Sequence, residues 1–333
     1  METPPPRWVR RLFLAPFVFL CALALTVASP VLHLFAAVLD VIFDRGRWRL
    51  SRFVGIGLAF CAVEVFGLFT LFTVWVGSGF GLFMKRPFWV RANTLLTGQY
   101  LEMITRAIKF FLGFGFRYSY EPFPPGRQLL FPRHAGPGDA FLIARVVIRD
   151  AGRKVHMVGA AKLQWDPFLD IVGERLDFHY LNQNPDDTEA ELKNIRDLAA
   201  GLEADETLVI FPEGANYTDS RKQQQIESLV ARDNTNRVAL ARELKHTLLP
   251  RTGGVMAAIG GAPDAVVMLV AHAGLEGIHG FEDLWSRVPL GRDLVAHSWV
   301  VDRDVRPDDR SAMTEWLFEE WRQVDRWIDE HIV

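Results

Sequence analysis

Two short stretches of the chain carry side chains that could do acid–base chemistry. The first reads Phe-Pro-Arg-His-Ala-Gly-Pro-Gly-Asp from Phe131 to Asp139, so a histidine leaves an apolar run and a Gly-Pro-Gly turn follows it. Such a turn could bring the Asp139 carboxylate back onto the His134 imidazole, which would fix the tautomer and leave the other ring nitrogen free as a general base. The plainer alternative is that Asp139 is only a helix N-cap and His134 a loop histidine.

The second stretch runs from Val209 to Gly214 and ends in Phe-Pro-Glu-Gly. Glu213 could bind hydroxyl groups or order a cation, and Gly214 would allow the backbone to approach a ligand closely. A simple turn at the end of a strand is the alternative interpretation.

The elements around these stretches alternate between short apolar runs and helical patterns. Prolines at 122, 124 and 125 and Gly126 mark a boundary before the first of them. We expect strands at 128–132, 154–160, 176–181, 207–211, 265–271 and 294–301, and helices at 139–150, 187–202 and 311–330. This alternation predicts an α/β domain with a largely parallel central sheet, which binds its ligand where the strands end.

In this order, the motifs match a known pattern. The segment from about residue 120 to 275 resembles the glycerolipid acyltransferases, the lysophosphatidic acid acyltransferase family, which carries a His-x4-Asp motif, a later Phe-Pro-Glu-Gly motif and a proline-centred motif. The proline-centred motif corresponds to 249–254 and includes Arg251, and 161–167 looks like the family's lysine-bearing segment, with Lys162. The matching residues of the first two motifs are His134, Asp139, Phe211, Pro212, Glu213 and Gly214.

The resemblance implies transfer of a fatty acyl group from acyl-CoA or acyl carrier protein to a hydroxyl of a lysophospholipid, with no metal and no other cofactor. His134 would accept the hydroxyl proton while Asp139 orients it, and such a base typically contributes about 10²–10⁴-fold in rate. Lys162, or turn amides near 136–138, could stabilise the oxyanion. Arg251 suits the acceptor phosphate because a guanidinium binds two oxygens.

Three positions depart from the family pattern. Arg133 stands where an Asn usually precedes the histidine, and Ala215 stands where a Thr usually follows Phe-Pro-Glu-Gly. A further motif of the family usually ends in an Arg that holds the acceptor's phosphate. The corresponding stretch, 176–180, has no Arg, so Arg251 or Arg175 would have to hold the phosphate. These departures support an alternative, a catalytically degenerate membrane scaffold or lipid-binding protein on the same fold. A hydrolase is less favoured because no Gly-x-Ser-x-Gly elbow occurs.

The N-terminal part of the chain is strongly apolar. Half of the 333 residues are hydrophobic, no residue from 12 to 39 is charged, and Glu64 is the single charged residue from 53 to 84. These runs are long enough for membrane helices, with Pro30 expected to break or kink the first. A cleaved signal peptide is disfavoured because apolar sequence continues past Pro30. An intramembrane carboxylate is a functional-site hypothesis by default. We interpret Glu64 instead as a protonated or helix-paired residue near an interface, since no second intramembrane charge accompanies it.

Arginines and lysines flank both apolar runs, so their distribution discriminates poorly between topologies. We favour a transmembrane hairpin with both ends in the cytoplasm, and a monotopic arrangement on one face of the membrane also fits. The predicted organisation is membrane-anchoring helices at 1–91, an amphipathic interfacial helix at 92–117 and an acyltransferase domain at 118–333. The expected localisation is an integral membrane protein whose catalytic domain lies on the cytoplasmic face.

Several classes are excluded by composition and spacing. The two cysteines, Cys21 and Cys61, lie inside the apolar runs, and no Cys/His cluster has zinc spacing. The net charge is −3 and no sustained basic face occurs outside the flanks of the apolar runs, so no nucleic-acid partner is expected. The predicted partners are therefore the membrane, the acyl donor and the lysophospholipid.

Overall fold

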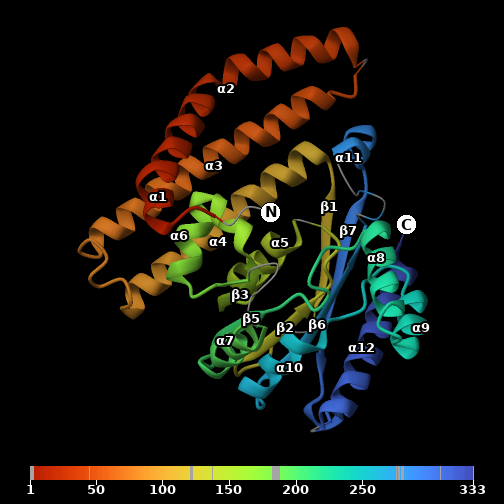
Figure 1. The fold of residues 1–333 in the computed structure, drawn as a ribbon. Coiled ribbons are helices and arrows are strands. Elements are labelled where there is room, and N and C mark those ends of the chain that lie inside the picture. The colour runs from red at the N-terminus through yellow and green to blue at the C-terminus, as the bar shows by residue number, and fades with distance from the viewer. Residues whose placement is uncertain are drawn as a thin grey trace.

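The computed structural model describes residues 4–44, 46–120, 123–136, 138–181, 188–274, 276, 278, 281–307 and 309–332. Long N-terminal helices lie along one side of the molecule, and a seven-stranded sheet with its covering helices forms the rest (Figure 1). Three residues of the predicted boundaries and turns lie outside the described residues: Pro122, Pro137 and Asp187.

The sheet has the strand order β1-β7-β6-β2-β5-β3-β4. Every neighbouring pair is parallel except β6 and β7, which confirms the predicted α/β fold with a largely parallel sheet. The strands are β1 (Gly115–Tyr120), β2 (Gln128–Pro132), β3 (Lys154–Ala160), β4 (His179–Leu181), β5 (Glu206–Val209), β6 (Val266–Ala273) and β7 (Asp293–Val301).

Helices cover both faces of the sheet because successive strand residues point to opposite sides. On β2, Leu129 and Phe131 pack into one buried cluster, while Leu130 belongs to the cluster on the other face. The first cluster includes α7 (Thr188–Ala200), α9 (Thr235–Glu243), α10 (Thr252–Gly261) and α12 (Arg310–His331). The second includes α4 (Pro87–Leu112), α5 (Asp139–Arg145) and α6 (Pro167–Arg175).

Two N-terminal helices are long and apolar enough to cross a membrane, judged by length and composition. The first is continuous from α1 (Arg7–Val9) through a π-helical turn into α2 (Ala15–Phe43), and the second is α3 (Arg49–Gly77). Pro30 lies inside α2 and does not end it, so the predicted break is absent. A proline removes one backbone hydrogen bond and bends a helix, but apolar residues on both sides still favour helix.

Both ends of the α2–α3 hairpin contact the α/β domain. At the open end, the Arg10 and Arg11 side chains each lie 2.8 Å from a carboxylate oxygen of Asp170 in α6. At the loop end, the ring of Phe53 stacks on Trp285 of α11 (Phe281–Arg287), with centroids 5.2 Å apart. In Figure 1 the hairpin accordingly runs along the domain from α6 to α11.

Glu64 joins three helices in the middle of α3. Its carboxylate accepts hydrogen bonds from the Tyr100 hydroxyl (2.8 Å) and the Phe168 backbone N–H (3.3 Å). The Phe168 amide lies in the first turn of α6, whose free N–H groups attract a carboxylate. Glu64 is therefore a structural residue in this fold.

The structure adds elements that the sequence pattern did not indicate. Strand β1 pairs with β7, so the predicted boundary between 117 and 118 falls inside a strand of the sheet. Helices α6, α8 (Asp219–Val230), α9, α10 and α11 were also not predicted. The predicted helix at 139–150 is α5 followed by a π-helical turn, Val146–Asp150.

Candidate active site

The two motifs meet at one end of the sheet, where the carboxyl ends of the central strands β2 and β5 lie. Strand β2 lies between β5 and β6, so the segments that follow β2 and β5 emerge side by side. His134 follows the end of β2, Glu213 follows β5, and His272 lies near the end of β6. This is the edge where open α/β sheets bind ligands.

His134 and Asp139 face each other across the turn between β2 and α5. The Nδ1 atom of His134 lies 3.2 Å from Oδ2 of Asp139, and the same oxygen accepts a 2.7 Å hydrogen bond from the Gly136 backbone N–H. Asp139 is the first residue of α5, and Gly138 occupies the N-cap position. The carboxylate therefore orients the imidazole, as the catalytic interpretation requires, and does not cap the helix.

Asp139 stays ionised although its side chain is buried. Burial by itself would raise the pKa of this carboxyl, but the nearby His272 ring and the hydrogen bond with His134 hold the pKa of Asp139 well below its ordinary value. An ionised Asp139 favours the tautomer in which His134 Nδ1 carries the proton and donates it. The Nε2 atom then has a free lone pair, which is what a general base needs.

The His134 ring keeps one edge accessible. Its side chain is 21% exposed, and its ring packs against Phe211 with centroids 4.4 Å apart. Its backbone is held on both sides, because the carbonyl accepts a hydrogen bond from the Tyr217 N–H (2.7 Å) and the N–H donates to Glu213 (2.7 Å). His134 is therefore held on a fixed backbone with its side chain partly exposed.

Glu213 supports the site by accepting hydrogen bonds from two backbone N–H groups. Its side chain is buried, Oε1 accepts the His134 N–H, and Oε2 accepts the Leu248 N–H at 2.8 Å. Burial raises the pKa of Glu213 to about 8, against the opposing effect of these two N–H groups. With both oxygens bonded to backbone, the structure places Glu213 as a link between three loops, not as the predicted ligand for hydroxyls or a cation.

The Phe-Pro-Glu-Gly turn also holds the third motif. The buried Pro212 accepts a 2.7 Å hydrogen bond through its carbonyl from the Arg251 N–H. Gly214 has φ +71°, and a Cβ there would lie 2.9 Å from Cδ of Arg251. The positive φ is the conformation that favours glycine, whereas the exposed Arg251 side chain could move aside. The exposed Arg251 side chain thus lies directly over the turn.

Arg175 does not reach this edge of the sheet. Its Nη1 atom donates to the Leu71 carbonyl (3.1 Å) and to the Asn93 side chain (3.0 Å). Burial, together with the nearby Arg11, lowers the pKa of Arg175 to about 10. Of the two arginines considered for the phosphate, Arg251 alone lies beside the motifs.

Lys162 is exposed in the short 3₁₀-helix η3 (Ala161–Trp165) that follows β3. Strand β5 separates β3 from β2, so Lys162 shares the edge of the sheet with His134 without adjoining it. The Gly136 amide, the other predicted type of oxyanion donor, is already bonded to Asp139. A substrate spanning the edge could still reach the Lys162 ammonium group.

Comparison with known proteins identifies this part of the chain. A family model described as Acyltransferase matches residues 117–264, from β1 to just before β6. Residues 117–264 therefore match the acyltransferase family. The crystal structure of the 1-acyl-sn-glycerophosphate (LPA) acyltransferase PlsC from Thermotoga maritima is similar, with 16% identity and a TM-score of 0.48, over 94% of this chain and 97% of that chain. No curated protein matches the chain.

His272 was not predicted from the sequence, and Arg133 was noted only as a departure from the family pattern. His272 is a polar residue in the otherwise apolar strand β6, and this interruption was the available signal. The Nη1 atom of Arg133 donates to the His272 carbonyl and to Glu276 (2.8 Å), and Nη2 donates to the His246 carbonyl (3.0 Å). The Arg that replaces the family's Asn thus ties the end of β6 to the catalytic turn.

The acyltransferase domain has a narrow apolar crevice beside Asp139 and His272. Its volume is about 20 Å³. The residues that line it with these two are Phe116, Tyr118, Leu142, Ile143, Val146, Val270, Leu294 and Ala296.

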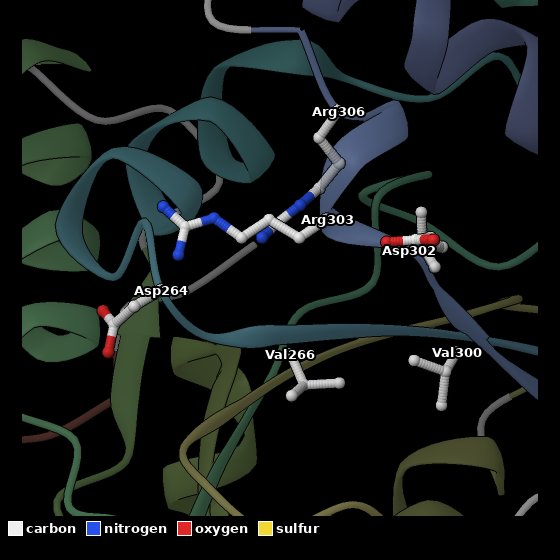
Figure 2. A pocket seen from close by; sticks show the side chains of 7 residues that line it. Asp264, Val266, Val300, Asp302, Arg303 and Arg306 are labelled. Atoms are coloured by element: carbon white, nitrogen blue, oxygen red, sulfur yellow. The ribbon is translucent and has the colours of Figure 1, made fainter.

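A larger hollow of about 470 Å³ lies at the other end of β6, beside Val266. Figure 2 shows Arg303 and Arg306 reaching into it. It is remote from the catalytic turn, because Val266 begins the strand that His272 nearly ends. In the described ranges, no three His, Cys, Asp or Glu side chains cluster closely enough to hold a metal ion.

Proposed function

We propose that this chain is a membrane-associated O-acyltransferase that moves a fatty acyl group from acyl-CoA or acyl carrier protein to a hydroxyl of a lysophospholipid. The observation that carries the proposal is the His134–Asp139 pair, held at the carboxyl edge of the sheet inside an acyltransferase domain. The buried, ionised Asp139 argues against a degenerate scaffold, since a costly buried charge beside a histidine serves no purpose there.

The reaction follows from this pair. Nε2 of His134 takes the proton from the acceptor hydroxyl as that oxygen attacks the thioester carbonyl carbon. The C–S bond then breaks, and His134 returns the proton to the departing thiolate, so an ester and a free thiol are formed without a covalent enzyme intermediate. Asp139 stabilises the imidazolium that exists between the two proton transfers.

Arg251 binds the acceptor phosphate in this proposal. Its guanidinium is exposed and lies over Gly214, on the loop whose neighbour Glu213 holds the His134 backbone. A bidentate contact to phosphate would fix the lysolipid headgroup while its hydroxyl approaches His134. Lys162, further along the same edge, is the proposed donor to the oxyanion.

The hairpin lies in one leaflet of the membrane in this proposal. Three observations support it: α6 pairs with Arg10, α11 stacks on Phe53, and Leu71 near the end of α3 bonds to Arg175. A transmembrane hairpin would carry its loop to the far side, away from the domain. The exposed face of α2, with Val31 71% and Phe35 63% exposed, would instead enter the lipid.

An acyl-transfer assay tests the function. Purified protein in detergent is given labelled acyl-CoA or acyl carrier protein and a panel of lysophospholipids, and the diacyl product is measured. We expect product with at least one acceptor and a raised KM for that acceptor in Arg251→Gln. Absence of product with every pair, together with no thermal stabilisation by any acyl donor, would favour the scaffold alternative.

A further inference from the structure

A second histidine lies against the catalytic carboxylate. His272 on β6 is 5% exposed, and its Nε2 atom lies 3.5 Å from Oδ1 of Asp139, while His134 contacts Oδ2. The two imidazoles therefore approach different oxygens of one carboxylate. His272 lies on β6, whereas His134 and Asp139 belong to the turn and helix that follow the adjacent strand β2, far away in sequence.

The His272 ring lacks the partners that a buried imidazole normally has. Within the described part of the chain, neither ring nitrogen has a hydrogen-bond partner, since 3.5 Å to Asp139 is long for a hydrogen bond. The backbone of His272 is held by Arg133, whose Nη1 donates to its carbonyl, and this places the ring beside Asp139.

We propose that His272 is a positioning residue that shares Asp139 with His134 and thereby lowers the basicity of the catalytic imidazole. The inference rests on the proposed function, in which His134 is the base. A donor on Oδ1 withdraws electron density from the carboxylate, so Asp139 stabilises the His134 imidazolium less. The effect has the same sign whether His272 donates as a neutral ring or carries a charge, because a second positive charge also disfavours the His134 imidazolium.

The other groups around Asp139 leave this role to His272. Glu213 approaches from the β5 side and is bonded to two backbone N–H groups, and Arg133 is paired with Glu276. From the described residues, the titratable or charged groups that face this cluster are His134, His272, Glu213, Arg133 and, along the crevice from β1, Tyr118. Removing His272 should therefore leave His134 as the one imidazole beside Asp139, which also keeps its hydrogen bond from the Gly136 N–H.

The consequence is an effect of His272 on the pH dependence of catalysis. Without His272, the His134 imidazolium would be more stable and the neutral ring scarcer at a given pH. The acid limb of the kcat/KM profile should then move to higher pH in His272→Phe, by about one unit if the lost interaction is worth one tenfold change. His272→Gln places an amide N–H near the position of Nε2 and should restore the wild-type profile.

The test combines this profile with an NMR titration of the histidine ring protons in the full-length protein in detergent. The His134 signal is assigned by its absence in His134→Ala, and His179→Gln, which removes a distant histidine paired with Glu191, is the matched control. We expect the His134 titration midpoint to rise in His272→Phe and to stay unchanged in His272→Gln and His179→Gln. An unchanged midpoint in folded His272→Phe would overturn the proposal, as would an equal rise in His272→Gln. If His272→Phe does not fold, His272→Leu takes its place in the same comparison.

The NMR arm needs no substrate. If no acyl transfer is found, the proposed function fails while the sharing of Asp139 is still measured. If transfer occurs and the midpoint does not move, His272 alone is misassigned.

Discussion

Each carboxylate in the site has one physical task. Asp139 is kept ionised by imidazole rings and orients His134, whereas Glu213 bonds to backbone N–H groups and holds the loops in place. Orientation of the imidazole and support of the loops are therefore tasks of two different acids. The distinction can be measured because the two tasks have different effects on folding.

Glu213→Ala should destabilise the protein as well as inactivate it. The substitution leaves the His134 and Leu248 N–H groups unpaired in a buried place, which should lower the free energy of unfolding by about 2–4 kcal/mol. Displacement of the His134 backbone should lower kcat about 10²-fold. Denaturation in mild detergent and the acyl-transfer assay measure the two effects. Glu227→Ala, at an exposed carboxylate, is the control, and equal stability of the two variants would refute the bracing role.

The sequence predicted the local part of this site and not the rest. His134 and Asp139 are joined by one short turn, so their pairing follows from spacing. The Glu213 carboxylate meets N–H groups of His134 and Leu248, which only the sheet order brings near it. His272 was not predicted, because its neighbour Asp139 belongs to another element and only the folded sheet brings the two together.

At the scale of elements, α3 packs closely against α4 and α6 at Gly67. A Cβ at Gly67 would lie 2.6 Å from Cδ2 of Phe168 and 2.8 Å from Cδ2 of Tyr100. These two rings stack with centroids 3.5 Å apart and an interplanar angle of 7°, and both are fully buried, so neither can move aside easily. The close approach also keeps Glu64 within reach of its partners on α4 and α6.

Gly67→Ala should therefore cost about 1–3 kcal/mol of stability through overpacking. Gly57 lies on the same helix and is exposed, with no atom within 4 Å of an added Cβ. Gly57→Ala should be neutral or stabilise by up to about 1 kcal/mol, because alanine has the higher helix propensity. Thermal denaturation of the two variants side by side is the measurement. A melting temperature lowered equally in both would mean that α3 does not dock at Gly67.

A pH-dependent contribution to stability comes from the start of β5. Glu206 lies 2.8 Å from Lys154 Nζ and 3.0 Å from His156 Nε2, both on β3. Burial alone would raise the pKa of Glu206, but these partners lower it to about 2. The ionised form therefore stabilises the fold above about pH 4.5, and this contribution disappears as the pH falls toward 2.

Glu206→Gln should lose up to about 3 kcal/mol of unfolding free energy at pH 7. The difference from wild type should shrink as the pH is lowered and vanish near the acid end of the range. Urea unfolding at several pH values measures this slope. A difference that does not change with pH would show that Glu206 is not held ionised by its neighbours.

The elements themselves were predictable where strands are buried on both faces. β2 and β3 have the bounds predicted from their apolar runs, and β6 and β7 differ from prediction at their ends. β1 was missed because Phe116 and Tyr118 alternate with polar residues at the edge of the sheet, next to a helical pattern. Its partner β7 lies at the other end of the sequence, so no local signal could indicate the pairing.

At the scale of the whole molecule, the α2–α3 hairpin and the α/β domain form one structure. The proposed single-leaflet arrangement predicts that the α2–α3 loop lies on the same side of the membrane as the domain. Arg47 in that loop and Ser220 on α8 are both exposed. Cysteines placed at the two positions should react with a membrane-impermeant maleimide from the same side.

The experiment uses sealed membrane vesicles of known orientation and a background in which Cys21 and Cys61 are replaced by Ser. Arg47→Cys and Ser220→Cys should be labelled in the same vesicle orientation and protected in the other. Labelling of the two positions from opposite sides would establish a transmembrane hairpin instead. In that case the contacts of α11 with Phe53 would have to be absent in the membrane.

The central claim is that His134 is the base of an acyl transfer. Its most direct test is the initial rate of acyl transfer from a labelled thioester donor to the preferred lysophospholipid, measured for wild type, His134→Ala and His179→Ala. His179 lies on the outermost strand β4, three strands away from β2. It is paired with Glu191 and controls for the loss of a histidine. We predict that kcat falls about 10²–10⁴-fold in folded His134→Ala and is unchanged in His179→Ala. A folded His134→Ala protein that transfers acyl groups at the wild-type rate would contradict the account.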